Sequence, residues 1–283
     1  MRLLLAELAP RRGATDANLD RIAASLVGRR VDVAVFPELF VTGYALGDRV
    51  HRLALAAGGP EMDRLDAIAR DARTALVVGA PRASSERVGE VENVALAVAP
   101  GGDRHHRAKR YLPTYGPFEE GQFFSPAARS DPVPLAGHAV GLAICYDAFF
   151  PEVFRALALG GADLLILLSA SPVTSRRLFE RILPARAIEN ATPLVFVNRT
   201  GVEDGIVFGG GSGAWDARGE PIPLEERPGA VGGPGEHLFE VEIDLNAIRG
   251  WRPFRPVLRD AAARPESPGA AGTAPELRFQ PRP

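Results

Sequence analysis

Cysteine is almost missing from this chain of 283 residues: Cys145 is the only one. A disulfide bond within the chain is therefore impossible, and a zinc site built on paired cysteines is excluded. The five histidines do not show the spacing of a helical zinc motif, so no metal site is expected. These absences leave one free thiol whose role the rest of the sequence has to explain.

Long apolar runs are missing too. No segment approaches the ~20 consecutive apolar residues that a membrane-spanning helix needs. The first ten residues also lack the apolar core and small-residue cleavage site of a signal peptide. We therefore expect a cytoplasmic protein without a membrane partner.

The chain also lacks an excess of either charge, since 33 basic residues accompany 35 acidic ones and the formal net charge is -2. Proteins that neutralise phosphates are usually basic, so no nucleic-acid partner is expected. Lysine is nearly absent, because Lys109 is the only one and all other members of the Lys+Arg group are arginines. A single retained amine suggests a task unsuited to a guanidinium, such as placing a compact charge beside a developing oxyanion.

Apolar strand-like runs alternate with segments of helical periodicity along most of the chain. This alternation indicates a layered α/β fold, with 1–259 as one domain and the Pro/Gly/Ala-rich segment 260–283 as an extended or disordered tail. Strands are predicted over 2–8, 31–36, 75–79, 94–99, 139–144, 164–168, 194–197 and 238–243, and helices over 16–27, 61–72, 151–159 and 175–189.

Two candidate reactive residues follow predicted buried strands. Cys145 comes directly after 139–144, and Glu38 follows 31–36, so both lie where open α/β sheets place ligand sites. Each has an ordinary alternative, because a free cysteine is often an inert core residue and a carboxylate at a strand end often faces water. No histidine occupies a comparable position, since His105 and His106 lie in a polar run that reads as a surface turn.

Three sequence blocks together narrow the alternatives. Segments 36–44 (FPELFVTGY), 109–113 (KRYLP) and 144–152 (ICYDAFFPE) resemble, in order and spacing, the three motif blocks of the nitrilase superfamily of carbon–nitrogen hydrolases. The resemblance extends over about residues 2–245. It implies a four-layer α-β-β-α sandwich and a reaction that needs no metal or organic cofactor.

The resemblance also implies roles for individual residues. Cys145 is the expected nucleophile and Glu38 the expected general base. Lys109 is expected to stabilise the tetrahedral oxyanion, together with the backbone N–H of Tyr146. The family's second glutamate aligns best with Glu120 in 118–126, and the neighbouring Glu119 is the competing choice.

The substrate is less closely specified. Segments 36–48, 112–120 and 201–212 look most similar to the glutaminase domain of glutamine-dependent NAD synthetases, and 186–190 also resembles small ω-amino-amide amidases. A substrate ammonium would favour carboxylates or aromatic rings at the mouth, and a substrate carboxylate would favour a basic residue at the start of helix 175–189. The candidate substrate-binding residues are Tyr44, Tyr115, Glu119, Tyr146, Asp147 and Arg176, with Arg177 as an alternative to Arg176.

The expected activity is therefore hydrolysis of a small linear amide through a cysteine thioester, giving a carboxylate and ammonia. A nitrilase or an N-carbamoyl amidase is the alternative within the enzyme class. A stand-alone glutaminase subunit that feeds ammonia to a separate synthetase is a second alternative, and an inert binding module is a third. Relatives in the superfamily assemble as dimers, so a homodimer or higher homo-oligomer is expected.

Overall fold

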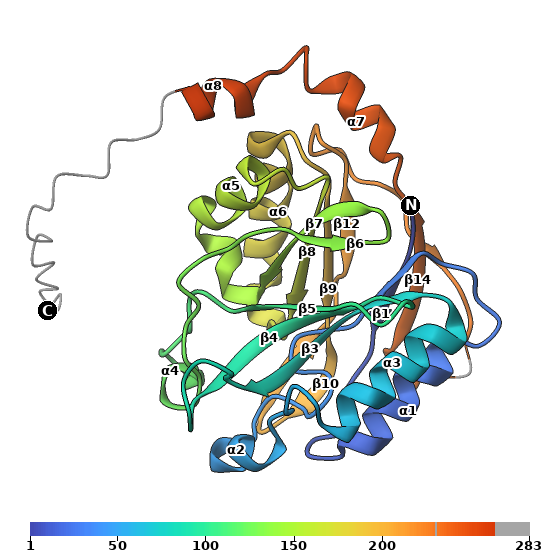
Figure 1. Ribbon diagram of the computed structural model, residues 1–283, viewed down its shortest axis with the longest axis vertical. Helices are drawn as coiled ribbons and strands as arrows, with labels where there is room; N and C mark the ends of the chain where they lie inside the picture. The colour runs from blue at the N-terminus through green and yellow to red at the C-terminus, as the bar shows by residue number, and fades with distance from the viewer. Residues whose placement is uncertain (230, 264–283) are drawn as a thin grey trace, which may run out of the picture.

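The computed structural model describes residues 1–229 and 231–263. Two β-sheets lie face to face at the centre of the molecule (Figure 1). Helices α1 (Thr15–Ser25) and α3 (Pro60–Ala72) lie outside one sheet, and α5 (Pro151–Leu159) and α6 (Arg176–Asn190) lie outside the other. The predicted four-layer α-β-β-α sandwich is confirmed. Within the described part of the chain, no helix is long and apolar enough to cross a membrane.

The larger sheet has seven strands in the order β13-β14-β1-β2-β3-β4-β5. Strands β1, β2 and β3 are parallel to one another, and the remaining neighbours pair antiparallel. The strands are β1 (Arg2–Glu7), β2 (Val33–Val35), β3 (Ala75–Ala83), β4 (Val91–Val98), β5 (Arg104–Ala108), β13 (Glu225–Glu226) and β14 (His237–Glu242).

The smaller sheet has five strands in the order β12-β9-β8-β7-β6, of which β7, β8 and β9 are parallel. A separate hairpin, β10 with β11, follows β9. These strands are β6 (Val133–Leu135), β7 (His138–Ile144), β8 (Leu164–Ser169), β9 (Leu194–Asn198), β10 (Thr200–Glu203), β11 (Ile206–Gly209) and β12 (Gly213–Trp215).

Four of the helices, α1, α3, α5 and α6, cover the outer faces of the two sheets. The α-helices are α1 (Thr15–Ser25), α2 (Val50–Leu53), α3 (Pro60–Ala72), α4 (Glu120–Phe123), α5 (Pro151–Leu159), α6 (Arg176–Asn190), α7 (Leu245–Trp251) and α8 (Val257–Ala263). Short 3-10 helices are η1 (Gly47–Arg49), η2 (Cys145–Phe149) and η3 (Val173–Ser175). Because α8 ends at Ala263, the first residues of the predicted tail are helical, and 264–283 lie outside the described residues.

The apolar strand runs are explained by burial on both faces. In β1, Leu3 and Leu5 pack between the two sheets, whereas Leu4 and Ala6 pack with residues of α1 and α3. A strand covered on both sides has no need of polar alternation, which is why these runs are continuously apolar. The same arrangement brings the carboxyl ends of β2, β7 and β8 to one region of the molecule.

The prediction of a surface turn at His105 and His106 was wrong. Both histidines belong to β5, the edge strand beside β4. His106 is half-buried, and its Nε2 lies 3.1 Å from Nη1 of Arg82. Burial, followed by the neighbouring guanidinium of Arg82, lowers the pKa of His106 to about 4. This ring is therefore neutral near pH 7 and belongs to the packing of the edge strand.

Candidate active site

The residues singled out in the sequence come together at strand ends of both sheets. Glu38 lies just beyond β2 and Lys109 just beyond β5, both in the larger sheet, whereas Cys145 follows β7 of the smaller sheet. The electrostatic influence of Glu38 and Lys109 reaches the thiol of Cys145. The site is thus formed where the two sheets meet.

Cys145 has an unusual backbone conformation. Its φ is +44°, in the left-handed region that residues other than glycine seldom adopt. It is the first residue of η2, so the chain turns sharply between the strand and the helix. Such strained residues concentrate at functional sites and cost about 1–3 kcal/mol each. The next N–H, that of Tyr146, is among the first of a helical turn and so has no partner within that turn.

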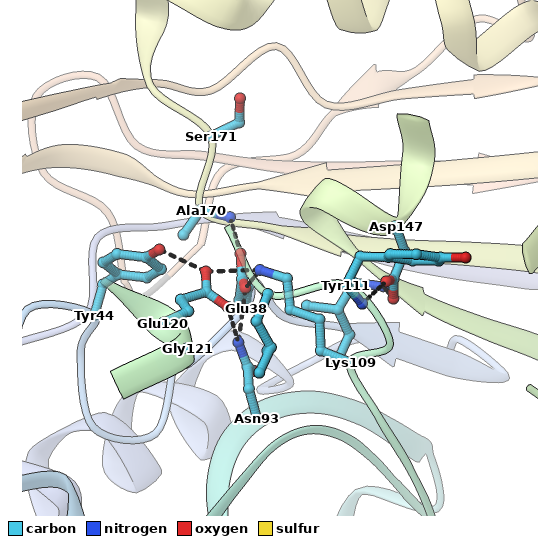
Figure 2. A network of polar contacts seen from close by, with 12 residues as sticks. Glu38, Tyr44, Asn93, Lys109, Tyr111, Glu120, Gly121, Asp147, Ala170 and Ser171 are labelled. Atoms are coloured by element: carbon cyan, nitrogen blue, oxygen red, sulfur yellow. Dashed lines mark hydrogen bonds and ion pairs between the residues drawn. The ribbon is translucent and has the colours of Figure 1, made fainter. Parts of the chain in front are cut away.

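Figure 2 shows a buried ion-pair network of Glu38, Lys109 and Glu120. The charges of these groups act on the thiol of Cys145. Nζ of Lys109 lies 2.7 Å from Oε1 of Glu38 and 2.7 Å from Oε1 of Glu120. The three side chains are between 0% and 4% exposed. Glu120 is the first residue of α4, and the neighbouring Glu119 is exposed. Of the two glutamates considered from the sequence, Glu120 therefore belongs to the network and Glu119 does not.

Burial and charge act in opposite directions on these groups. Burial favours a neutral Lys109, but the carboxylates of Glu120 and Glu38 outweigh it and raise the pKa of the ammonium. Burial raises the pKa of Glu120, an effect that Lys109 reduces. Burial, reinforced by Glu38 and opposed by Lys109, raises the pKa of the Cys145 thiol. The resting cysteine is therefore a thiol, and it needs a base to become a nucleophile.

Two further groups bind the carboxylates, and the sequence analysis did not identify either. Nδ2 of Asn93 donates to Oε1 of Glu38 at 2.8 Å and lies 3.5 Å from Oε2 of Glu120. The backbone N–H of Ala170 donates to Oε2 of Glu38 at 2.8 Å (Figure 2). An asparagine within an apolar strand was the available signal for Asn93, but the predicted strand began one residue after it.

Tyr44 is held by two glutamates, Glu120 at its side chain and Glu203 at its backbone. Its hydroxyl donates to Oε1 of Glu120 at 2.6 Å, and burial followed by the charge of Glu120 raises its pKa, so it stays protonated. Oε1 of Glu203 accepts the N–H groups of Tyr44 and Ala45 at 2.9 and 2.7 Å. Glu203 is in turn paired with the buried Arg199. Tyr44 thus contacts a candidate catalytic group directly.

Asp147 lies elsewhere than the predicted substrate-binding position. It is 2% exposed, and its carboxylate accepts the N–H groups of Arg110, Tyr111 and Ile144 at 3.1, 2.9 and 3.1 Å. Burial raises its pKa to about 7, although Lys109 and the backbone N–H groups oppose the shift. Instead of lining the mouth, Asp147 ties the segment after Lys109 to the residue before Cys145.

A hollow of about 560 Å³ has aromatic and apolar walls that include Tyr115, Phe118, Pro172 and Val173. The rings of Tyr115 and Tyr146 are 5.5 Å apart, which connects this wall to the residue after the nucleophile candidate. Glu119 borders a smaller adjoining hollow with Tyr44 and Glu120. A volume of this size suits a small organic ligand.

Arg176 lies at a different cavity. It borders that cavity with Ser171, Phe179 and Asn198, and its Nε donates to Glu180 at 3.0 Å. Its guanidinium is thus already engaged by an acidic partner. Within residues 1–229 and 231–263, no group of three or more His, Cys, Asp or Glu side chains is placed to hold a metal ion.

Comparison with known proteins places this arrangement in a family. The sequence profile of the carbon-nitrogen hydrolase family matches residues 5–253. The chain therefore belongs to the carbon–nitrogen hydrolases of the nitrilase superfamily, and its two mixed sheets have the nitrilase-type arrangement.

Two curated relatives differ in length. An (R)-stereoselective amidase of Pseudomonas sp. is 32% identical over 263 residues, which cover 92% of this chain and 91% of the amidase. The glutamine-dependent NAD(+) synthetase of Rhodobacter capsulatus is 32% identical over 270 residues, which cover 93% of this chain but 46% of the synthetase. This chain thus spans about half the length of that synthetase.

Solved structures agree with this placement. An amidase from Nesterenkonia sp. superimposes with a TM-score of 0.73 at 29% identity, covering 90% of this chain and 94% of that one. In two structures of variants of that amidase, acrylamide and the acetamide moiety of fluoroacetamide are covalently attached to the active-site cysteine. A carbon-nitrogen hydrolase from Helicobacter pylori G27 shares the fold with a TM-score of 0.81 at 23% identity, covering 94% of this chain and 96% of that one.

Proposed function

We propose that this carbon–nitrogen hydrolase cleaves the C–N bond of a small linear amide through a thioester on Cys145. The observation that carries the proposal is the Lys109 ammonium held between two buried carboxylates beside a cysteine with a left-handed backbone. The amidases among its relatives, one of them similar over nine-tenths of both chains, support the choice of an amide.

Acylation begins with attack of the Cys145 sulfur on the amide carbon. Glu38 accepts the thiol proton as the C–S bond forms, because the thiol is not ionised at rest. The carbonyl oxygen becomes anionic and is stabilised by the Lys109 ammonium and the N–H of Tyr146. Glu38 then returns the proton to the leaving nitrogen, the C–N bond breaks, and ammonia departs from the thioester.

Deacylation uses the same groups. Glu38 takes a proton from a water molecule as the water oxygen attacks the thioester carbon, and Lys109 again faces the oxyanion. The C–S bond then breaks, the proton passes to sulfur, and the carboxylic acid product leaves. Glu120 holds the Lys109 ammonium in place through a contact of 2.7 Å, and the Tyr44 hydroxyl holds Glu120 through a contact of 2.6 Å.

The test is ammonia release from a panel of substrates, with Cys145→Ala as the control. The panel contains simple aliphatic amides, 5-aminopentanamide, glutamine, asparagine, an N-carbamoyl amine and a nitrile. We expect turnover of at least one amide and none by Cys145→Ala. Turnover of only the nitrile or the N-carbamoyl amine would replace the amidase proposal with the corresponding alternative.

A stand-alone glutaminase is the second candidate function, because a glutamine-dependent NAD(+) synthetase matches 93% of this chain. In that case glutamine alone in the panel is hydrolysed, and the rate rises when a separate synthetase is added. Equal turnover of simple aliphatic amides and glutamine without a partner would contradict this candidate.

A further inference from the structure

Asn93 is a polar residue on a face that is otherwise apolar. It lies in β4 and points between the two sheets, on the same side as Ala95 and Ala97. The side chain is fully buried. Burying an amide costs free energy unless its polar atoms are bonded, so the bonds that Asn93 makes indicate why it is there.

The side-chain bonds of Asn93 go to the two carboxylates of the site. Nδ2 lies 2.8 Å from Oε1 of Glu38 and 3.5 Å from Oε2 of Glu120, below the pair in Figure 2. Oδ1 accepts no hydrogen bond from any residue that the structure describes. The amide is thus used as a donor toward the carboxylates rather than as a link in the packing of β4.

The backbone of Asn93 binds the backbone of Lys109, the third residue of the network. Its carbonyl oxygen accepts the N–H of Lys109 at 2.8 Å, at the end of the β4–β5 ladder. One residue therefore contacts Glu38, Glu120 and Lys109. In the proposed reaction, the Lys109 ammonium also interacts with the oxyanion, so its bonds to the two carboxylates weaken. A second donor is then needed to hold the carboxylates in place.

We propose that Asn93 is a positioning residue that orients the carboxylates of Glu38 and Glu120 through its neutral N–H donor. This inference rests on the proposed amidase function. Donation of a hydrogen bond to a carboxylate favours its charged form. Because the amide is uncharged, Asn93 adds no net charge to the site.

The expected consequence is a change in pH dependence. Asn93→Leu keeps the size of the side chain and removes the donor, so the carboxylate pair takes up a proton more readily. Loss of a hydrogen bond to a carboxylate should raise the pKa of that carboxylate by about one to two units. We expect the acidic limb of kcat/KM to move to higher pH by this amount, with a lower maximum.

A matched control separates positioning from folding. Val94 is the next residue, is fully buried, and packs on the opposite face of the same strand. Val94→Ala should lower stability and leave the acidic limb where it is in the wild type. If Asn93→Leu lowers stability and activity without moving the limb, the residue is merely structural and the proposal is overturned.

A second variant and a second readout keep the test decisive. Asn93→Asp preserves the shape of the side chain, but an ionised aspartate donates no hydrogen bond and repels the two carboxylates. It should therefore also move the acidic limb to higher pH, and it serves as the test if Asn93→Leu fails to fold. The rate at which iodoacetamide alkylates Cys145 should show the same shift in each folded variant, and it requires no turnover. If the wild type hydrolyses no amide, the proposed function fails, and the alkylation profiles alone decide the role of Asn93. Coincident profiles for the wild type and the Asn93 variants would overturn it.

Discussion

Gly79 is the position where the fold most directly constrains the candidate base. It lies in β3, against the segment that carries Glu38. A methyl group at this position would lie 2.3 Å from the oxygen of Pro37, 2.4 Å from the nitrogen of Leu39 and 2.5 Å from Cα of Glu38. All three are backbone atoms. Gly79 is not among the residues with positive φ, so alanine at this position is opposed by contact and not by backbone conformation.

The structure gives the size of the displacement that Gly79→Ala requires. The closest contacts must open from 2.3–2.5 Å to at least 3.0 Å, so the segment around Glu38 has to move by about 0.5–0.7 Å. Misplacement of a catalytic group by ~1 Å costs about 10²-fold in rate. We therefore expect kcat/KM to fall roughly ten- to a hundredfold. Overpacking of this kind should also lower the free energy of unfolding by about 1–3 kcal/mol.

Gly141→Ala is the matched control for this experiment. Gly141 lies in β7 of the smaller sheet, and its added methyl would meet side chains, Cδ2 of Leu165 in β8 at 2.9 Å and Cβ of Leu157 in α5 at 3.1 Å. It should lower stability without a comparable loss of kcat/KM. Both variants are assayed by ammonia release and by urea unfolding. Wild-type kcat/KM in a folded Gly79→Ala variant would refute the claim that this close approach sets the position of Glu38.

Four further outcomes are expected. Because the pKa of Cys145 is raised by burial, its alkylation by iodoacetamide should keep increasing above pH 9; a plateau near the ordinary thiol pKa of about 8.5 would contradict this. Lys109→Met removes the ammonium between two buried carboxylates, and it should cost about 3–5 kcal/mol in urea unfolding and at least about 10²-fold in kcat; stability equal to that of the wild type would argue against the ion pair. The pKa of Asp147 is raised from 3.8 to about 7, so between these pH values the native state binds a proton that the unfolded state has lost. The free energy of unfolding should therefore fall by up to about 4 kcal/mol as pH rises from 4 to 7. Asp147→Asn should lack this slope, and parallel pH profiles of stability for the wild type and Asp147→Asn would contradict the prediction. Light scattering should give at least a homodimer, and a monomer at micromolar concentration would contradict that prediction.

Much of the architecture was predictable because apolar periodicity reports burial. The helix at 151–159 has the predicted bounds, and most predicted strands lie within a few residues of the observed ones. Hairpin partners such as β5 and β10 were missed because edge strands and hairpins carry polar residues and lack continuous apolar runs. The layer order followed from the family resemblance rather than from periodicity.

The candidate site was predictable only where residue type and motif agreed. Glu38, Lys109 and Cys145 stand in quoted motif blocks, and the structure brings them together. Asp147 shares a block with Cys145, but the sequence does not show that its carboxylate accepts hydrogen bonds from three backbone N–H groups. Asn93 belongs to no quoted block, and its contact with Glu38 depends on the pairing of β3 with β4.

The pairing of β1 with β14 has a consequence for synthesis of the protein. Arg2 lies opposite Glu242, so β1 leaves the ribosome long before the strand with which it pairs. Until His237–Glu242 emerges, β1 keeps an open edge of unpaired backbone groups, which is a template for aggregation. A nascent chain can therefore hold all of its candidate catalytic residues and still be exposed to misassembly. Chaperone binding or a translational pause before β14 would act in that interval.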